Sequence, residues 1–324
     1  MYAYAEHPVP EVTTTTIGHG LELLSCLPEQ ATRPPILCVH GAFAGAWCWA
    51  EHFMPWFAER GYPIYAVSLR GHGESQGEEH LARHTLRDYV RDVICAVEHI
   101  GEPPIVVGHS MGGFVAQKYL EYSGRRGMGL LGVALMASVP PQGLIPTATL
   151  MMMTRPALTR RVMLLCSGGP ELAARFTRPN DLRRSLFSSA LPSATLTEYF
   201  SRFQGESQRA VLDMSLLDPL RLWLMPRVPI ITFGAEHDAF IPPALIQATA
   251  MTYGCPSQIV RGMGHVMMLE RHWEEAAQPL YRWAEQVSAQ HAPAEHCEEM
   301  PSAEMSSAEM SSAEPFSAEA SGAA

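Results

Sequence analysis

Short, continuous runs of aliphatic residues recur along this chain, and they constrain its fold more than any other feature. The runs occupy residues 36–39, 64–69, 105–107, 130–136 and 230–233. Such runs are typical of strands buried on both faces of a parallel sheet. Residues 85–100 instead place apolar side chains at three- and four-residue spacing before Gly101 and Pro103, which predicts an amphipathic helix. Strands that alternate with helices predict an α/β fold, with a mostly parallel sheet flanked by helices.

The sequence changes character twice after residue 138, and these changes predict its organisation. Residues 139–215 are rich in Met, Leu and Arg and are broken by proline and glycine, so we expect an inserted helical lid there. The strand pattern then resumes, so residues 1–138 and 216–290 form the two parts of the core. Residues 291–324 repeat a Ser-Ala-Glu unit at a spacing that suits neither a helix face nor a strand. We expect a disordered acidic tail there.

Charge and cysteine content exclude several functional classes. The tail holds seven Glu and no Lys or Arg, so it carries most of the formal net charge of -10. The remainder is close to neutral, and no basic field that favours nucleic acid is expected. The cysteines are scattered without a C-x-x-C pair, no secretory signal is visible, and no apolar stretch is long enough to span a membrane. We therefore expect a cytoplasmic protein, and its oligomeric state stays open.

The pentapeptide G-x-S-x-G occurs twice, and its context separates the two copies. The copy at 108–112 follows an apolar run and precedes a helical pattern, which is the strand–turn–helix context of a nucleophile elbow. Its serine, Ser110, is then held in a sharp turn that leaves no room for side chains on the flanking glycines. An ordinary glycine-rich turn is the alternative. The copy at 73–77 is followed by polar residues, and we interpret Ser75 as part of a solvated loop.

The context of Ser110 resembles the α/β-hydrolase fold family, and the resemblance covers most of residues 20–288. In that family the acid and then the base follow the nucleophile along the chain. His265 lies in a late Gly-His loop similar to the family's, and Asp238 lies in a loop after the expected strand at 230–233. A serine hydroxyl is a poor nucleophile until a base takes its proton and an acid orients that base. The resemblance implies a triad of these three residues.

Other residues compete for the roles of acid and base. Glu236 is the nearest competitor of Asp238, although it can equally be a surface carboxylate. Asp213 and Asp218 precede the strand and are weaker candidates. A structural loop histidine is the alternative interpretation of His265.

Residues 40–49, with the sequence HGAFAGAWCW, also carry the resemblance. They are similar to the subset of the family that contains plant methyl-ester esterases and hydroxynitrile lyases. By this resemblance the backbone amides of Ala42 and Met111 donate to the oxyanion, and His40 is structural. Trp47 either contacts the substrate or only packs the first helix.

Apolar side chains near the expected triad predict an apolar substrate. Methionine is flexible and suits irregular ligand shapes, although packing of the lid onto the core explains each of these residues equally well. The expected substrate-binding residues are Phe43, Trp47, Met151, Met152, Phe240 and Val266.

These features together predict a carboxylesterase-like serine hydrolase. We expect it to cleave an ester of a small to medium apolar substrate through an acyl-enzyme intermediate. The family's triad also serves thioesterases, amidases, carbon–carbon bond hydrolases, haloperoxidases and hydroxynitrile lyases, and some members are hormone receptors, so the fold does not choose among these. The sequence contains no metal-binding motif and no dinucleotide fingerprint, so no metal and no cofactor are expected.

Overall fold

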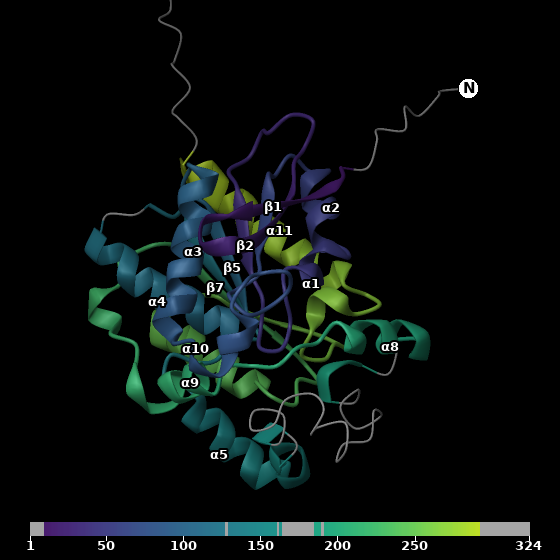
Figure 1. Cartoon of the computed structure of the whole chain (residues 1–324), viewed down its shortest axis with the longest axis vertical. Coiled ribbons are helices and arrows are strands. Elements are labelled where there is room, and N and C mark those ends of the chain that lie inside the picture. The colour runs from purple at the N-terminus through teal and green to yellow at the C-terminus, as the bar shows by residue number, and fades with distance from the viewer. Residues whose placement is uncertain (1–9, 127–128, 161, 164–184, 189–190, 292–324) are drawn as a thin grey trace, which may run out of the picture. The chain divides into compact units, whose positions relative to one another are not determined.

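An eight-stranded sheet forms the centre of the protein (Figure 1), in a computed structural model that describes residues 10–126, 129–160, 162–163, 185–188 and 191–291. Its strand order is β1-β2-β4-β3-β5-β6-β7-β8. β2 pairs antiparallel with both β1 and β4, whereas all pairs from β4 to β8 are parallel. The strands are β1 Val12–Ile17, β2 Leu21–Cys26, β3 Ile36–Val39, β4 Ile64–Val67, β5 Ile105–His109, β6 Gly132–Met136, β7 Ile230–Ala235 and β8 Ser257–Val260.

The five expected strands are all present, and the mostly parallel α/β sheet is confirmed. β3, β5 and β6 are buried along their whole length, which explains their continuous apolar sequence. β1, β2 and β8 were not among the expected strands. β1 is a threonine-rich edge strand with mostly exposed side chains, and β8, at the other edge, has one buried residue. Neither edge strand therefore shows an apolar run.

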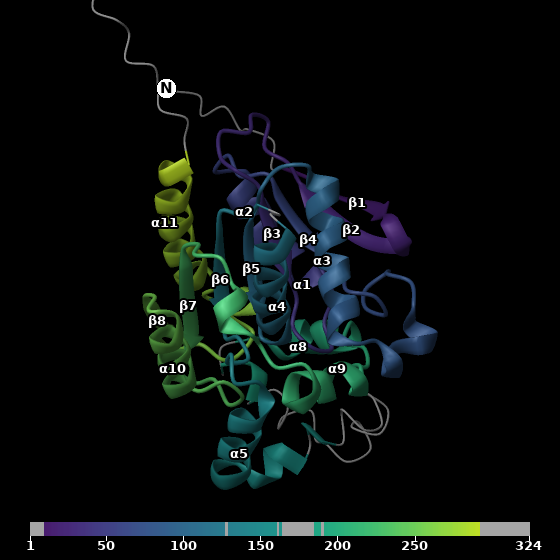
Figure 2. The ribbon, with the colours of Figure 1, turned by 90° about the vertical axis from the view of Figure 1, so that its left-hand side faces the viewer.

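Helices cover both faces of the sheet (Figure 2). Alternate side chains of each central strand point to opposite faces. Cys38 therefore belongs to the core on the face of α1, α2 and α11, and its neighbour Leu37 to the core on the face of α3, α4 and α10. These helices are α1 Trp47–Ala50, α2 Phe53–Ala58, α3 Leu86–Ile100, α4 Met111–Arg126, α10 Pro243–Tyr253 and α11 Glu274–His291, with shorter 3₁₀ segments at Gly18–Gly20, Glu78–Arg83 and Met267–Leu269.

α3 shows how local sequence fixes a helix. Thr85 and Asp88 form a capping box, in which each side chain accepts a hydrogen bond from the backbone amide of the other. Gly101 ends the helix with a φ of 78°, a conformation that glycine adopts without a steric penalty. The helix therefore lies where the apolar spacing predicts it.

A helical insertion separates β6 from β7, in the region where the sequence predicts a lid. Its described helices lie beyond the carboxyl ends of the parallel strands (Figure 1), and α5 contributes to the same cavity as Ser110. Residues 164–184 of the expected lid and residues 292–324 of the expected tail lie outside the described part of the chain. Among the described elements of the insertion are α5 Leu144–Thr154, α8 Ser193–Ser201, α9 Gln208–Leu212, the π-helical turn Asp213–Leu217 and the 3₁₀ turn Leu222–Leu224.

Candidate active site

Ser110 occupies the turn between β5 and α4. Its φ of 52° lies in the left-handed region, which side chains other than glycine rarely occupy. The turn is held by hydrogen bonds from the Ser110 amide to the carbonyl oxygen of Met136 (3.0 Å) and from the Val139 amide to the Ser110 carbonyl oxygen (3.1 Å). A Cβ on Gly112 would collide with the backbone oxygens of Val39 and His40, where β3 passes into the loop that follows it. The second glycine of the motif is therefore required for helix α4 to approach that loop.

Ser110, His265 and Asp238 form a continuous hydrogen-bonded chain. His265 Nε2 lies 3.0 Å from Ser110 Oγ, and His265 Nδ1 lies 2.7 Å from Asp238 Oδ2. Asp238 Oδ1 accepts hydrogen bonds from the amides of Phe240 (2.8 Å) and Ile241 (2.9 Å). An ionised carboxylate only accepts, so the proton between the acid and the base belongs to His265 Nδ1. The lone pair on Nε2 then faces the serine hydroxyl.

The competing carboxylates are bound elsewhere. Glu236 is exposed and accepts a hydrogen bond from the Gly262 amide at 2.9 Å. Asp213 accepts hydrogen bonds from the Leu86 amide and a neighbouring arginine, and Asp218 pairs with lysine and arginine. Of these carboxylates, Asp238 is the one hydrogen-bonded to the His265 ring.

Ser75, the serine of the other G-x-S-x-G copy, is buried rather than solvated. Its hydroxyl donates to the Ser68 carbonyl oxygen (2.6 Å) and accepts from the Glu22 amide (2.8 Å). The expectation of a solvated position is therefore wrong for Ser75, although its neighbours Glu74 and Gln76 are exposed. The serine hydroxyl ties this loop to the start of β2.

His40, at the start of the loop after β3, has a structural environment. Its Nε2 accepts a hydrogen bond from the Leu69 amide (3.0 Å), so Nδ1 carries the proton and donates to the Gly41 carbonyl oxygen (2.8 Å). Burial lowers the pKa of His40 to about 3, with a further contribution from nearby His72. The ring is therefore neutral and ties the loop to the segment after β4.

The two residues whose backbone amides are expected to bind an oxyanion both line the cavity. They are Ala42 and Met111, and neither amide donates a hydrogen bond to another residue of the described chain. Met111 is also the first residue of α4, so the positive end of the helix dipole lies beside Ser110. Both amides are thus available to a ligand at the serine.

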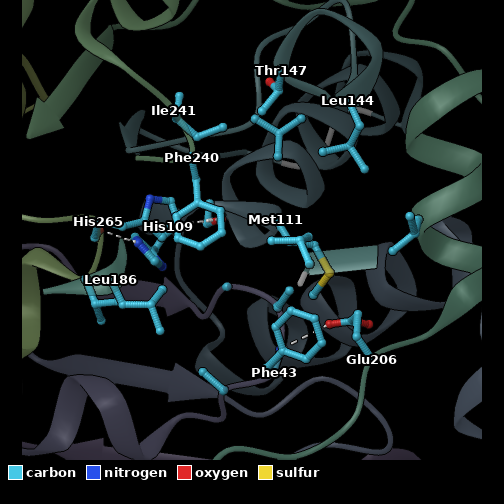
Figure 3. Close-up of a pocket in the computed structure, with 18 of the residues that line it drawn as sticks. Phe43, His109, Met111, Leu144, Thr147, Leu186, Glu206, Phe240, Ile241 and His265 are labelled. Atoms are coloured by element: carbon cyan, nitrogen blue, oxygen red, sulfur yellow. Dashed lines mark hydrogen bonds between the residues drawn. The ribbon is translucent and has the colours of Figure 1, made fainter. Parts of the chain in front are cut away.

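A cavity of about 620 Å³ adjoins Ser110 and His265, with a largely apolar wall (Figure 3). Of the expected substrate-binding residues, Phe43, Met151, Phe240 and Val266 line it. The Phe240 ring lies beside the His265 ring, with 5.0 Å between centroids. The insertion supplies much of the remaining wall, including Leu144, Thr147, Val162, Phe200, Phe203, Val211 and Met214.

Met152 and Trp47 do not line the cavity, contrary to expectation. Met152 is 55% exposed on the outer side of α5, because successive residues of a helix point about 100° apart. Trp47 is buried between α1 and α8, where its ring contacts those of Tyr199 and Phe203 at centroid distances of 6.0 Å and 5.9 Å. It packs the insertion onto the core.

A histidine and a carboxylate of the cavity wall were missed from the sequence. His109 precedes Ser110 and contacts the His265 backbone, and Glu206 is a fully buried carboxylate on the side of the cavity formed by Phe43 (Figure 3). Glu206 lies in the polar segment Gly-Glu-Ser-Gln, which has the composition of a surface loop. No local signal distinguishes it.

Within the part of the chain that the structure describes, no group of three His, Cys, Asp or Glu side chains could hold a metal ion. None of the helices in that part of the chain combines the length and the apolar character needed to cross a bilayer.

The chain is similar to several known proteins over part of its length. Epoxide hydrolase B of Mycobacterium tuberculosis is 28% identical over 119 residues, 36% of this chain and 33% of that protein. A non-heme haloperoxidase of Rhodococcus erythropolis is 34% identical over 128 residues, 39% of this chain and 44% of that protein. The matched region thus spans less than half the length of these curated relatives.

A solved structure and a family model extend the likeness over the domain. The esterase RhEst1 from Rhodococcus sp. ECU1013 superposes with a TM-score of 0.63 at 17% identity, covering 85% of this chain and 99% of that one, which shows a shared fold. The model described as "Alpha/beta hydrolase family" matches residues 36–278, from β3 into α11. This chain belongs to the alpha/beta hydrolase family.

Proposed function

We propose that this protein is a serine hydrolase that cleaves a carboxylic ester of a small to medium apolar substrate through an acyl-enzyme intermediate. The observation that carries the proposal is the hydrogen-bonded chain from Asp238 through His265 to Ser110, at the edge of an apolar cavity. This arrangement supplies a nucleophile, a base and an orienting acid in contact with one another. The esterase with the same fold is consistent with the proposal.

The first half-reaction forms the acyl-enzyme. Ser110 Oγ attacks the carbonyl carbon of the ester while its proton passes to His265 Nε2. Asp238 stabilises the imidazolium that results. The carbonyl oxygen becomes an oxyanion, and the amides of Ala42 and Met111 donate to it. The carbon–oxygen bond to the alcohol then breaks, and the proton on Nε2 passes to the leaving alkoxide.

The second half-reaction releases the acid. Water replaces the alcohol and gives a proton to His265 Nε2 as its oxygen attacks the acyl carbon. The second oxyanion forms in the same place, and the amides of Ala42 and Met111 bind it again. Collapse of this intermediate breaks the bond to Ser110 Oγ and returns the proton to the serine.

The cavity supports an apolar substrate. Its volume of about 620 Å³ lies within the usual range for small-molecule sites, roughly 300–1,000 Å³. Methionine and phenylalanine side chains from the insertion form much of its wall, so the insertion acts as a lid over the bound acyl or alcohol group.

Some relatives are named as epoxide hydrolases, so epoxide hydrolysis is a second candidate reaction. A serine nucleophile is poorly suited to it. Attack of Ser110 Oγ on an epoxide carbon would leave an ether, which the second half-reaction cannot hydrolyse. A carboxylate nucleophile would instead leave an ester, which water can cleave. Ser110 at the turn therefore supports acyl transfer.

A panel of p-nitrophenyl esters, from acetyl to dodecanoyl, tests the proposal. The wild-type protein should show multiple turnovers, and Ser110→Ala should lose about 10³-fold or more in kcat/KM. Ser75→Ala is the matched control, because it alters the same pentapeptide at the structural copy. It should keep turnover while losing some stability.

Two results would contradict the proposal. Equal turnover by the wild type and Ser110→Ala would exclude this nucleophile. A protein that binds apolar ligands but never exceeds one turnover on any ester would instead be a ligand receptor. A fluorophosphonate label that mass spectrometry locates on Ser110 would add a check that is independent of substrate choice.

A further inference from the structure

Glu206 is a carboxylate enclosed in the wall of an apolar cavity (Figure 3). Its side chain is fully buried. Oε1 accepts hydrogen bonds from the Tyr89 hydroxyl (2.8 Å) and the Ser207 amide (2.6 Å), and Oε2 accepts one from the Phe43 amide (3.3 Å). These donors occupy both oxygens, so Glu206 acts on the protein itself rather than on a substrate.

His72 compensates the charge of this carboxylate. Its Nε2 lies 3.2 Å from Glu206 Oε2, both side chains are fully buried, and its Nδ1 lies 3.3 Å from the Arg70 carbonyl oxygen. Burial lowers the pKa of His72, but the charge of Glu206 outweighs this and leaves that pKa raised. Burial likewise raises the pKa of Glu206, but His72 and the hydrogen-bond donors leave it lowered. The geometry is that of a buried ion pair.

Phe43 is the residue on which this pair acts. Its φ of 67° is unfavourable for a side chain other than glycine, and such a conformation persists only where the surroundings impose it. The Phe43 amide donates to Glu206, and the Phe43 carbonyl oxygen accepts from the Gln204 amide at 2.9 Å. The segment 204–206 thus holds both sides of Phe43. The peptide group that it fixes joins Phe43 to Ala42.

We propose that Glu206 is a positioning residue for the oxyanion loop, defined as residues 41–43. By holding the Phe43 amide, Glu206 fixes the peptide that follows the Ala42 amide, while His72 balances its charge. Because Glu206 comes from the insertion and the loop comes from the core, the insertion sets the geometry of oxyanion binding. This inference rests on the proposed function of Ser110 and adds a role for residues outside its triad.

Glu206→Gln isolates the carboxylate with little change in size. A glutamine side chain has one acceptor oxygen and one amide nitrogen, which only donates. If the oxygen serves Tyr89 and Ser207, the nitrogen faces the Phe43 amide, and two donors then oppose each other. If the amide is reversed, the same conflict arises at Ser207. The substitution therefore displaces the loop or leaves a donor without a partner.

Glu206→Gln should change kcat and KM to different extents. Oxyanion binding matters in the transition state, so kcat of Glu206→Gln should fall by about tenfold to a hundredfold while KM changes little. Phenylboronic acid, which forms a tetrahedral adduct with an active serine, should bind more weakly by a similar factor. Inhibition by 1-hexanol, which forms no oxyanion, should stay unchanged.

Glu121→Gln is the matched control. Glu121 is also a buried carboxylate in ion pairs, with Lys118 at 3.0 Å and Arg221 at 2.8 Å, but it lies on α4 away from the cavity. It should lower the melting temperature and leave kcat and boronate affinity unchanged. A merely structural role for Glu206 would give the same pattern in both variants, and that result would overturn the inference.

Further outcomes separate this inference from the proposed function. An active wild type, an inactive Ser110→Ala and an unchanged kcat in Glu206→Gln would overturn the inference alone. A wild type without ester turnover would overturn both. If Glu206→Gln does not fold, His72→Gln replaces it, because this variant removes the compensating charge and keeps the carboxylate. A folded His72→Gln protein with normal kcat and boronate affinity would also overturn the inference.

Discussion

His265 Nε2 contacts the nucleophile, and the His265 carbonyl oxygen lies 3.0 Å from Nε2 of His109, the residue just before the nucleophile. Burial places the pKa of His109 well below its usual range, with a further lowering by His265, so its ring is neutral. Because the carbonyl oxygen only accepts, the single ring proton of His109 lies on Nε2. Two adjacent residues at the end of β5 therefore contact His265. His109 binds its backbone carbonyl oxygen, and Ser110 contacts its ring.

We predict that His109→Phe weakens catalysis as well as the fold. Phenylalanine keeps a ring but leaves the His265 carbonyl oxygen without this donor, at a cost of about 1–3 kcal/mol. Part of that cost should appear as a displacement of the His265 ring from Ser110, and kcat should then fall by about tenfold. His109→Gln keeps an N–H group and should recover most of the activity. Equal kcat in the two variants, measured by ester hydrolysis, would contradict this role.

We predict that Asp238→Asn preserves the loop and disrupts the base. The asparagine oxygen can still accept from the Phe240 and Ile241 amides, which Oδ1 accepts now. Its NH₂ group would then face His265 Nδ1 and favour a proton on Nε2, where the serine proton must go. We expect kcat to fall on the order of 10⁴-fold with a nearly unchanged melting temperature. Glu236→Gln, at the exposed competitor, should keep full activity.

Features that depend on neighbouring residues could be predicted from the sequence, and features that depend on packing could not. The turn at Ser110 needs a strand, two glycines and a helix within one short segment, so the local sequence was sufficient to predict this turn. Met151 and Met152 are adjacent and chemically identical, and only the rotation of α5 decides which one faces the cavity. Glu206 meets His72 across a long stretch of chain, and neither residue lies in a motif that requires the other.

The pH dependence of stability follows from the buried neutral His40. Its pKa is about 3 in the folded state and about 6.5 in the unfolded chain, so below about pH 6.5 the unfolded chain binds a proton that the folded protein does not. Stability should therefore fall as the pH is lowered from about 6.5 toward 3, by about 1.4 kcal/mol per pH unit for this group.

His40→Gln tests this dependence. Glutamine does not titrate, and its oxygen can accept from the Leu69 amide in place of Nε2. Urea unfolding at several pH values between about 6 and 4 should show a shallower decline for the variant than for the wild type. The comparison uses slopes, so a constant loss of stability does not affect it. Parallel slopes for the two proteins would show that His40 does not contribute to the pH dependence of stability.

Two glycines with different surroundings should respond differently to alanine. A Cβ at Gly112 would collide with backbone oxygens, so Gly112→Ala should destabilise the protein by more than about 3 kcal/mol or prevent folding. Gly254 has a φ of 61° in open space, so Gly254→Ala should cost only about 1–2 kcal/mol of left-handed strain. Melting temperatures and soluble yield measure both. Similar losses would contradict the close approach of α4 to the loop after β3.

The neighbouring methionines of α5 provide a test of what the cavity binds. Met151 is 6% exposed and lines the cavity beside Phe240, whereas Met152 is 55% exposed and faces away. Met151→Trp places an indole in the cavity and should lower kcat/KM for long-chain esters by about tenfold or more, because the longer acyl chains lose their space. Short-chain esters should be hydrolysed nearly as before.

Met152→Trp is the control, since it adds the same side chain one residue along the helix. Its chain-length profile should match that of the wild type, and its melting temperature should change little because exposed substitutions usually have small effects. If Met151→Trp also keeps the wild-type profile, the acyl chain does not occupy this part of the cavity. If both variants lose long-chain activity equally, the outer side of α5 contacts the substrate as well, and the proposed binding mode is wrong.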